Sequence, residues 1–300
     1  MTPWNTHALP GEHIGSLVIR THILSGHKQY KATAKGLGVC ANTTLKAQDF
    51  NSASIFTGMV KHTSSDTASN VANTHSPAPL WSLSLEKTNS QGWCPLDLIA
   101  TKRRLDSNIS ALNKSWHLCK CCVEADLIEH GFSYWHTAHQ LPGITHCYIH
   151  KTPLLTCTSL LRDLRLATLP QVYVNELQPQ YPNTEVFRQW STFVFNCFAA
   201  LRKDPNQATV LRNAARELLN LPKAYRVKDK HLFDNCLSEL EHAVDNALLA
   251  HIFRSYSNAN KPKSNFIKKS ILNEKSANYR SPVSWLLILF WLRNKIDFSF

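Results

Sequence analysis

Apolar residues recur at helical spacing along the first part of the chain. One face of residues 11–26 is largely apolar, and Gly26 is placed to cap the carboxyl end of a helix there. A second short helix is predicted over Tyr30–Lys35, and Thr43-Thr44-Leu45-Lys46 indicates a third helix start. Short helices joined by tight turns are compatible with a helix-turn-helix, although three-helix cores are common. The apolar positions of the first helix are Ile14, Leu17, Val18 and Leu24.

The pattern then changes twice. Residues 61–80 are dominated by Ser, Thr, Asn, Ala and His and contain two prolines, which predicts a mobile loop or linker. After it, a short helix is expected over Ala125–His130, ended by Gly131. Phe132–Trp135 is apolar enough for a strand or a plug of the core, and Leu141-Pro142-Gly143 predicts a turn.

From residue 156 onward the apolar spacing is helical throughout. Val210–Leu221 forms one predicted helix with Pro222 as its stop, and Asp229–Tyr256 forms one long helix or two short ones. Residues 257–280 are polar and basic. The stripe of the preceding helix consists of Val186, Phe187, Trp190, Phe193, Val194, Cys197 and Phe198.

One run near the end is apolar on all sides. Trp285–Leu292 has eight residues, whereas a bilayer span needs about 20, so a buried helix with Pro282 in its first turn is predicted. Met1-Thr2-Pro3-Trp4-Asn5 has neither the basic start nor the apolar run of a secretion signal. We expect a cytoplasmic protein with no membrane partner.

These elements predict a mainly α fold. Only 9 of 300 residues are Gly, which disfavours a turn-rich β protein. The expected division is a helical part that can hold a helix-turn-helix (1–60), a linker (61–93), a Cys/His module (94–157) and a basic helical domain (158–300).

The charge is uneven along the chain. Of the net charge of +12, residues 201–300 contribute 17 Lys and Arg against 9 Asp and Glu. A strongly basic segment of this kind favours a polyanionic partner, and nucleic acid is the first candidate. The alternative is a basic surface that binds nothing. The candidate phosphate contacts are Lys261, Lys263, Lys268, Lys269 and Arg280.

Two close-set pairs of metal-ligand residues carry the strongest chemical signal. Cys119 and Cys122 form C-x2-C, and after 24 residues Cys147 and His150 form C-x2-H. Zinc binds thiolate sulfur and imidazole nitrogen tetrahedrally, and a closed set of four ligands leaves no position for water. The spacing therefore predicts one structural Zn²⁺. Isolated cysteines elsewhere indicate a reducing compartment and not a disulfide framework.

Other ligand choices remain open from spacing alone. Cys121 beside Cys122 makes C-x-C an alternative, and chance spacing of reduced buried thiols is another. We prefer Cys122 because its gap matches the second pair. The same window holds five further imidazoles, each expected to be a hydrogen-bonding residue: His117, His130, His136, His139 and His146.

Catalytic signatures are missing from the sequence. It contains no Gly-rich phosphate loop, no G-x-S-x-G, no H-E-x-x-H and no H-x-E before the C-x2-C of a zinc deaminase. A non-enzymatic protein is predicted.

The residues between the pairs resemble a known family. Cys119-x2-Cys122-x3-Asp126, Gly131-x2-Tyr134-Trp135, His139-Gln140-Leu141-Pro142-Gly143 and Cys147-x2-His150 are similar to the TniQ/TnsD family of transposon target-site selectors. Leu9-Pro10-Gly11-Glu12, leading to Arg20-x-His22-x-Leu24-Ser25-Gly26, resembles the opening of that family. Ser281-Pro282 and the following apolar helix resemble the TnsD type more weakly, and TnsD-type chains usually extend beyond 300 residues.

The resemblance implies a role in DNA transposition. Such proteins bind an attachment site and recruit an AAA+ ATPase regulator of the TnsC type, which passes the target to the transposase. It implies that Cys119, Cys122, Cys147 and His150 hold structural zinc, and that Trp135 and His139 are core residues. The alternatives are an adapter between a guide-RNA (CRISPR-associated) complex and the ATPase, or a zinc-ribbon DNA-binding regulator unconnected with transposition.

Overall fold

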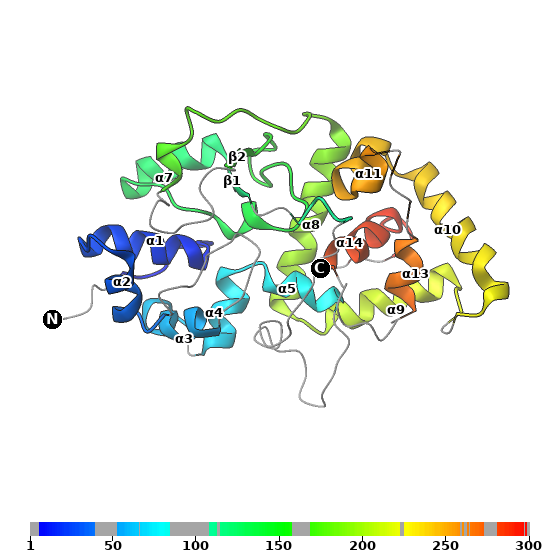
Figure 1. The fold of residues 1–300 in the computed structure, drawn as a ribbon, viewed down its shortest axis with the longest axis horizontal. Coiled ribbons are helices and arrows are strands. Elements are labelled where there is room, and N and C mark those ends of the chain that lie inside the picture. The colour runs from blue at the N-terminus through cyan, green and yellow to red at the C-terminus, as the bar shows by residue number, and fades with distance from the viewer. Residues whose placement is uncertain are drawn as a thin grey trace. The chain divides into compact units, whose positions relative to one another are not determined.

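The computed structural model divides the chain into two compact units. In Figure 1 the first unit is drawn from blue to green, and the second mainly from yellow to red. The first unit holds described residues within 6–78 and 115–195, and the second those within 79–84, 108–112 and 196–298. No helix in the described part of the chain is long and apolar enough to cross a membrane. The structure describes residues 6–39, 53–65, 67–84, 108–112, 115–157, 169–222, 225–258, 260, 263, 265–272, 281–296 and 298.

The first predicted helices are confirmed. Helix α1 (Ile14–Ser25) begins where the His13 side chain accepts a hydrogen bond from the Gly15 amide, and it ends at Gly26 in the left-handed conformation. Helix α2 (Tyr30–Gly36) follows. The assignment of Leu24 to the buried face was wrong, because this side chain is 58% exposed. Helix α1 is buried on every side from Ile14 to Thr21, so its last turn alone faces solvent. The third predicted helix start, at residues 43–46, lies outside the described residues.

The linker expected at 61–80 is wrong. The segment holds the 3-10 turn η1 (Val60–His62) and the helices α4 (Ala68–His75) and α5 (Ala78–Trp81), after α3 (Ala53–Met59) and before the 3-10 turn η2 (Ser82–Ser84). Val71 and Leu80 are fully buried. The polar residues that suggested a linker serve as helix caps: the Thr67 hydroxyl accepts from the Asn70 amide, and the Ser76 hydroxyl bonds the Ala72 carbonyl. Residues 85–93 are outside the described part.

Gly58 allows α3 to pack against the chain after α2. A Cβ at this position would lie 2.2 Å from the Leu37 carbonyl oxygen, which is backbone and cannot rotate away. We therefore expect Gly58→Ala to destabilise the protein by about 1–3 kcal/mol. Thermal unfolding measures the loss. Gly36→Ala is the matched control, since nothing lies within 4 Å of its Cβ and its melting temperature should stay near that of the wild type. Equal melting temperatures for the two variants would contradict this packing.

The described part of the Cys/His module holds a small sheet, one helix and a 3-10 turn. Strands β1 (Trp116–Leu118) and β2 (Leu155–Cys157) pair antiparallel, with His117 opposite Thr156. Helix α7 (Lys120–His130) follows β1, and the 3-10 turn η3 (Thr137–Gln140) follows later. The predicted carboxyl end at Gly131 is confirmed, with Gly131 at φ 76°, but the helix begins five residues before the expected Ala125. This early start lets both residues of the C-x2-C pair belong to one helix terminus.

The remaining predictions for the first unit agree with the structure in outline. Phe132–Trp135 forms no strand but plugs the core, since Tyr134 is 5% and Trp135 3% exposed. The turn at Leu141-Pro142-Gly143 is present, closed by the Ile144 amide donating to the Leu141 carbonyl at 3.2 Å. After the 3-10 turn η4 (Pro170–Val172), the long helix α8 (Glu185–Lys203) begins.

The second unit is helical, and the predicted mainly α fold is confirmed. Its helices are α9 (Gln207–Leu219), α10 (Lys230–Ala243), α11 (Asn246–Ile252), α12 (Arg254–Ser257), α13 (Phe266–Ile271) and α14 (Pro282–Trp291), with the 3-10 turn η5 (Val227–Asp229) before α10. The predicted buried helix is α14, where Pro282 occupies the first turn and every residue from Pro282 to Phe290 is buried. The stretch 257–280, expected to be polar throughout, contains α13, whose Phe266, Ile267 and Ile271 are buried.

Candidate metal centre

The first pair lies at the start of α7. Cys119 follows β1 directly and occupies the cap position of the helix, and Cys122 lies one turn later and faces inward. Because one helical turn separates them, both sulfurs lie on the same side of the helix terminus. A helix terminus therefore presents this pair.

The second pair lies on a turn between His146 and Pro153, which form an isolated antiparallel bridge. The Lys151 amide donates to the Cys147 carbonyl at 2.9 Å, and the Cys147 amide donates to the Thr152 carbonyl at 2.9 Å. Lys151 adopts φ 56°, a left-handed conformation that reverses the chain. The His150 amide also points at the Cys147 sulfur, 3.5 Å away. This turn presents Cys147 and His150 together on one side of the loop.

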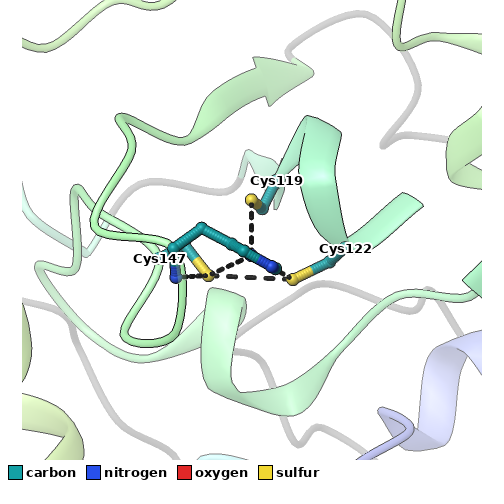
Figure 2. Close-up of side chains that lie close together, drawn as sticks. Cys119, Cys122 and Cys147 are labelled. Carbon is teal, nitrogen blue, oxygen red and sulfur yellow. Dashed lines mark hydrogen bonds between the residues drawn. The ribbon is translucent and has the colours of Figure 1, made fainter. Parts of the chain in front are cut away.

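The four side chains converge on one point. Figure 2 shows the sulfurs of Cys119, Cys122 and Cys147 directed at one another, and the four ligand atoms, with that of His150, lie within 4.8 Å of one another. The Cys122 and Cys147 sulfurs are 3.7 Å apart, and the His150 Nδ1 lies 3.5, 3.4 and 3.6 Å from the sulfurs of Cys119, Cys122 and Cys147.

These separations fit a tetrahedral metal. With metal–sulfur bonds of about 2.3 Å and metal–nitrogen bonds of about 2.05 Å, a tetrahedron has edges of about 3.8 Å between sulfurs and about 3.6 Å between sulfur and nitrogen. The Cys122–Cys147 distance and the three sulfur–nitrogen distances agree with these values to about 0.2 Å. The arrangement can hold one metal ion and is compatible with zinc. The four protein ligands fill a tetrahedron, so such an ion would be structural.

The crowded thiols shift one another's pKa. Hydrogen bonding with the neighbouring thiols lowers the pKa of Cys119 and raises the pKa of Cys122, because one thiolate is stabilised at the expense of the other two groups. The pKa of Cys147 is raised to about 11, chiefly by its bond with Cys119. A dication would replace the protons of these groups, which couples metal binding to proton release.

The competing ligand choices lie outside the cluster. Cys121 is half-buried and is not among the four converging residues. His139 comes nearest, with its Nε2 3.7 Å from the Cys122 sulfur, and burial lowers the pKa of His139 to about 3, so it remains a neutral core residue. Of the other imidazoles, His117 and His146 are buried, and the His136 Nε2 lies 2.9 Å from the Asp126 carboxylate, within hydrogen-bond distance.

The Gln140 side chain connects η3 to β1, because it forms hydrogen bonds with the β1 backbone as a neighbouring strand would. Its Oε1 accepts from the His117 amide at 3.0 Å, and its Nε2 donates to the His117 carbonyl at 2.8 Å and to the His136 carbonyl at 3.1 Å. The sequence singled out Gln140 only as part of a motif. This bonding fixes β1, and with it Cys119, against the core of the module.

Removing these bonds is expected to be costly. Gln140→Met keeps the length of the side chain but leaves the buried His117 amide and carbonyl unsatisfied, at about 1–3 kcal/mol for each group. We expect a loss of about 2–4 kcal/mol in chemical denaturation. Gln189→Met, which removes a 3.1 Å bond on the exposed face of α8, is the control and should change stability little. Equal effects of the two variants would contradict the role of Gln140.

The amino-terminal segment joins the module through its backbone. The His13 amide donates to the Trp135 carbonyl at 2.8 Å, and the Thr137 amide donates to the Gly11 carbonyl at 2.8 Å. The Trp135 amide donates to the Ser16 hydroxyl at 3.0 Å. The two stretches that carry the family resemblance, far apart in sequence, therefore form one structure.

A buried ion pair supports that junction. Arg20 Nη2 lies 2.7 Å from Glu12 Oε2, Arg20 Nε lies 3.1 Å from Oε1, and the Glu12 side chain is fully buried. The same carboxylate accepts from the Leu9 amide at 3.0 Å, and Arg20 donates to the His7 carbonyl at 2.5 Å. Both residues lie in the stretch that resembles the TniQ/TnsD family, but their spacing in the sequence does not predict a buried ion pair.

The residues predicted from sequence to contact DNA lie in different environments. Lys263 pairs with Glu241 at 3.4 Å and lies over the Tyr256 ring, whereas the Lys268 Nζ lies 3.3 Å from the centre of the Tyr225 ring. Lys269 is exposed on α13. Lys261 and Arg280 lie outside the described residues.

Comparison with known proteins gives one family. A search of curated proteins finds no match. The model of the TniQ family matches residues 3–154, which includes the amino-terminal segment and all four converging residues. The match spans half of the chain. The chain therefore belongs to the TniQ family and is a transposition-associated protein.

Proposed function

We propose that this protein selects target sites for a DNA transposon. It binds attachment-site DNA and recruits an AAA+ ATPase of the TnsC type, and it acts on the transposase only through that ATPase. The observation that supports the proposal best is the TniQ match over residues 3–154. The positive charge of the carboxyl-terminal third favours direct DNA contact. We place the protein at the nucleoid of a bacterial cell and assign it no catalytic step.

In this proposal, Cys119, Cys122, Cys147 and His150 hold one structural Zn²⁺. The agreement of their separations with a tetrahedron supports the assignment. The metal supplies folding energy to a module whose described residues form two short strands, one helix and a 3-10 turn, and the module in turn holds the amino-terminal segment in place.

A selection experiment tests the DNA-binding role. The purified full chain is incubated with a random duplex library, and the bound fraction is sequenced after several rounds. A target selector enriches one site, to which it binds more tightly than to scrambled duplexes and with a steep salt dependence. The bound complex should then retain the AAA+ ATPase of the same transposon. Equal affinity for scrambled duplexes, together with no capture of the ATPase, would overturn the proposal.

The same experiment separates the alternatives. An adapter for a guide-RNA complex captures the ATPase but shifts no duplex. A zinc-ribbon regulator enriches a DNA site but does not capture the ATPase.

A further inference from the structure

Two segments far apart in sequence form one basic surface in the second unit. The first leads through η5 into α10, and the second is α13. The Lys268 Nζ lies 3.3 Å from the centre of the Tyr225 ring, and the Asn265 side chain donates to the Phe233 carbonyl at 2.8 Å. We call this the η5–α13 surface, and its residues are Tyr225, Arg226, Lys228, Lys230, Lys268 and Lys269.

Positive charge on this surface is poorly compensated. Residues 225–230 and 265–272 carry five cations against one carboxylate, that of Asp229. Arg226, Lys228, Lys230 and Lys268 form no ion pair with any carboxylate in the described part of the chain. Lys263 differs, because Glu241 partly neutralises it. Like charges held close together repel one another, so a polyanion that approaches them stabilises the surface.

The local structure also presents these charges outward. Tyr225, Arg226, Val227 and Lys228 are consecutive exposed residues, and Val227 is 82% exposed. The Asp229 amide donates to the Arg226 carbonyl at 2.9 Å, which closes the turn and keeps neighbouring cations on a short, fixed segment. Lys268 over Tyr225 adds a cation from α13 to the same place.

We propose that the η5–α13 surface contacts the sugar–phosphate backbone of duplex DNA. This inference rests on the proposed function and names the part of the chain that binds the DNA. Several cations gathered on one exposed surface can contact successive phosphates of a duplex, and such contacts position a protein without reading sequence. Of the lysines chosen from sequence, Lys268 and Lys269 belong to this surface, while Arg226, Lys228 and Lys230 are added by the structure.

The test compares two triple variants of the full chain that lose equal charge. One carries Arg226→Gln, Lys228→Gln and Lys268→Gln. The other carries Lys28→Gln, Lys31→Gln and Lys35→Gln, three exposed lysines of the first unit. Binding to a mixed-sequence 25-base-pair duplex (about two helical turns) is measured by fluorescence anisotropy across a salt series. Melting curves verify that both variants stay folded.

We expect the η5–α13 variant to lose about tenfold or more in affinity at low salt, and its plot of log K against log salt to flatten by about 2–3. The control variant should keep the wild-type slope. An unchanged slope for the η5–α13 variant, or an equal loss of affinity in the control variant, overturns the assignment of DNA contact to this surface. The proposed function is not contradicted by either result. A wild-type chain that binds no duplex at any salt overturns both the surface and direct DNA binding. Loss of ATPase capture by the η5–α13 variant, with unchanged DNA binding, assigns the surface to an acidic protein partner and also overturns the inference.

Discussion

Replacing Cys122 or Cys147 by Ser is expected to abolish metal binding and unfold the Cys/His module. Both sulfurs belong to the cluster of four ligand atoms, and a Ser hydroxyl is a poor ligand for zinc at neutral pH. Structural zinc contributes about 10–16 kcal/mol of apparent binding energy in small zinc modules, as much as or more than the whole stability of an ordinary domain. Native mass spectrometry should show one zinc in the wild-type chain and none in either variant, and both variants should lose solubility.

Cys121→Ser is the matched control for this prediction. Cys121 is adjacent to Cys122 but lies outside the cluster, so its replacement should leave one zinc bound and the melting temperature close to that of the wild type. Damage as severe as that of Cys122→Ser would mean that Cys121 is a ligand. A wild-type chain that is folded and free of metal would refute the site.

Arg20→Met is expected to destabilise the first unit by about 3–5 kcal/mol. The substitution keeps most of the apolar stem but leaves the fully buried Glu12 carboxylate without its partner at 2.7 Å. The Leu9 amide would still donate to that carboxylate at 3.0 Å, but it carries no charge to balance it. Urea denaturation followed by tryptophan fluorescence reports the loss, because Trp116 and Trp135 lie in the same core.

The double variant Glu12→Leu with Arg20→Met separates pairing from packing. It removes the unpaired charge, so we expect it to be more stable than Arg20→Met alone, although the Leu9 amide and the His7 carbonyl lose their partners. Additive losses from the two single changes would show that the pair is not coupled and would contradict this account.

The four candidate ligands were predictable because zinc restricts both residue type and spacing. Cys119, Cys122, Cys147 and His150 come together in the structure as their pattern predicts. The buried α14 was predictable for a similar local reason, since an unbroken apolar run after Ser281-Pro282 leaves a helix few alternatives. Gly26 and Gly131 marked helix ends correctly because each adopts a left-handed conformation that favours glycine.

Residues 61–80 could not be assigned from sequence, because their polar side chains fit either a solvated loop or the ends of helices. Thr67 and Ser76 can be solvated in a loop or can bond backbone groups at helix ends, and local composition is the same in both cases. Only burial of Val71 and Leu80 against other elements decides for helices.

The sequence by itself determined the mainly helical class, the family resemblance and the four candidate ligands, because each depends on residue type and short-range spacing. Tertiary structure alone decided that Glu12 and Arg20 form a buried pair, that Gln140 completes the β1 edge, and that Lys268 meets Tyr225 beside a basic turn. These contacts join segments separated by many residues. Their energy depends on burial and distance, which local pattern does not encode.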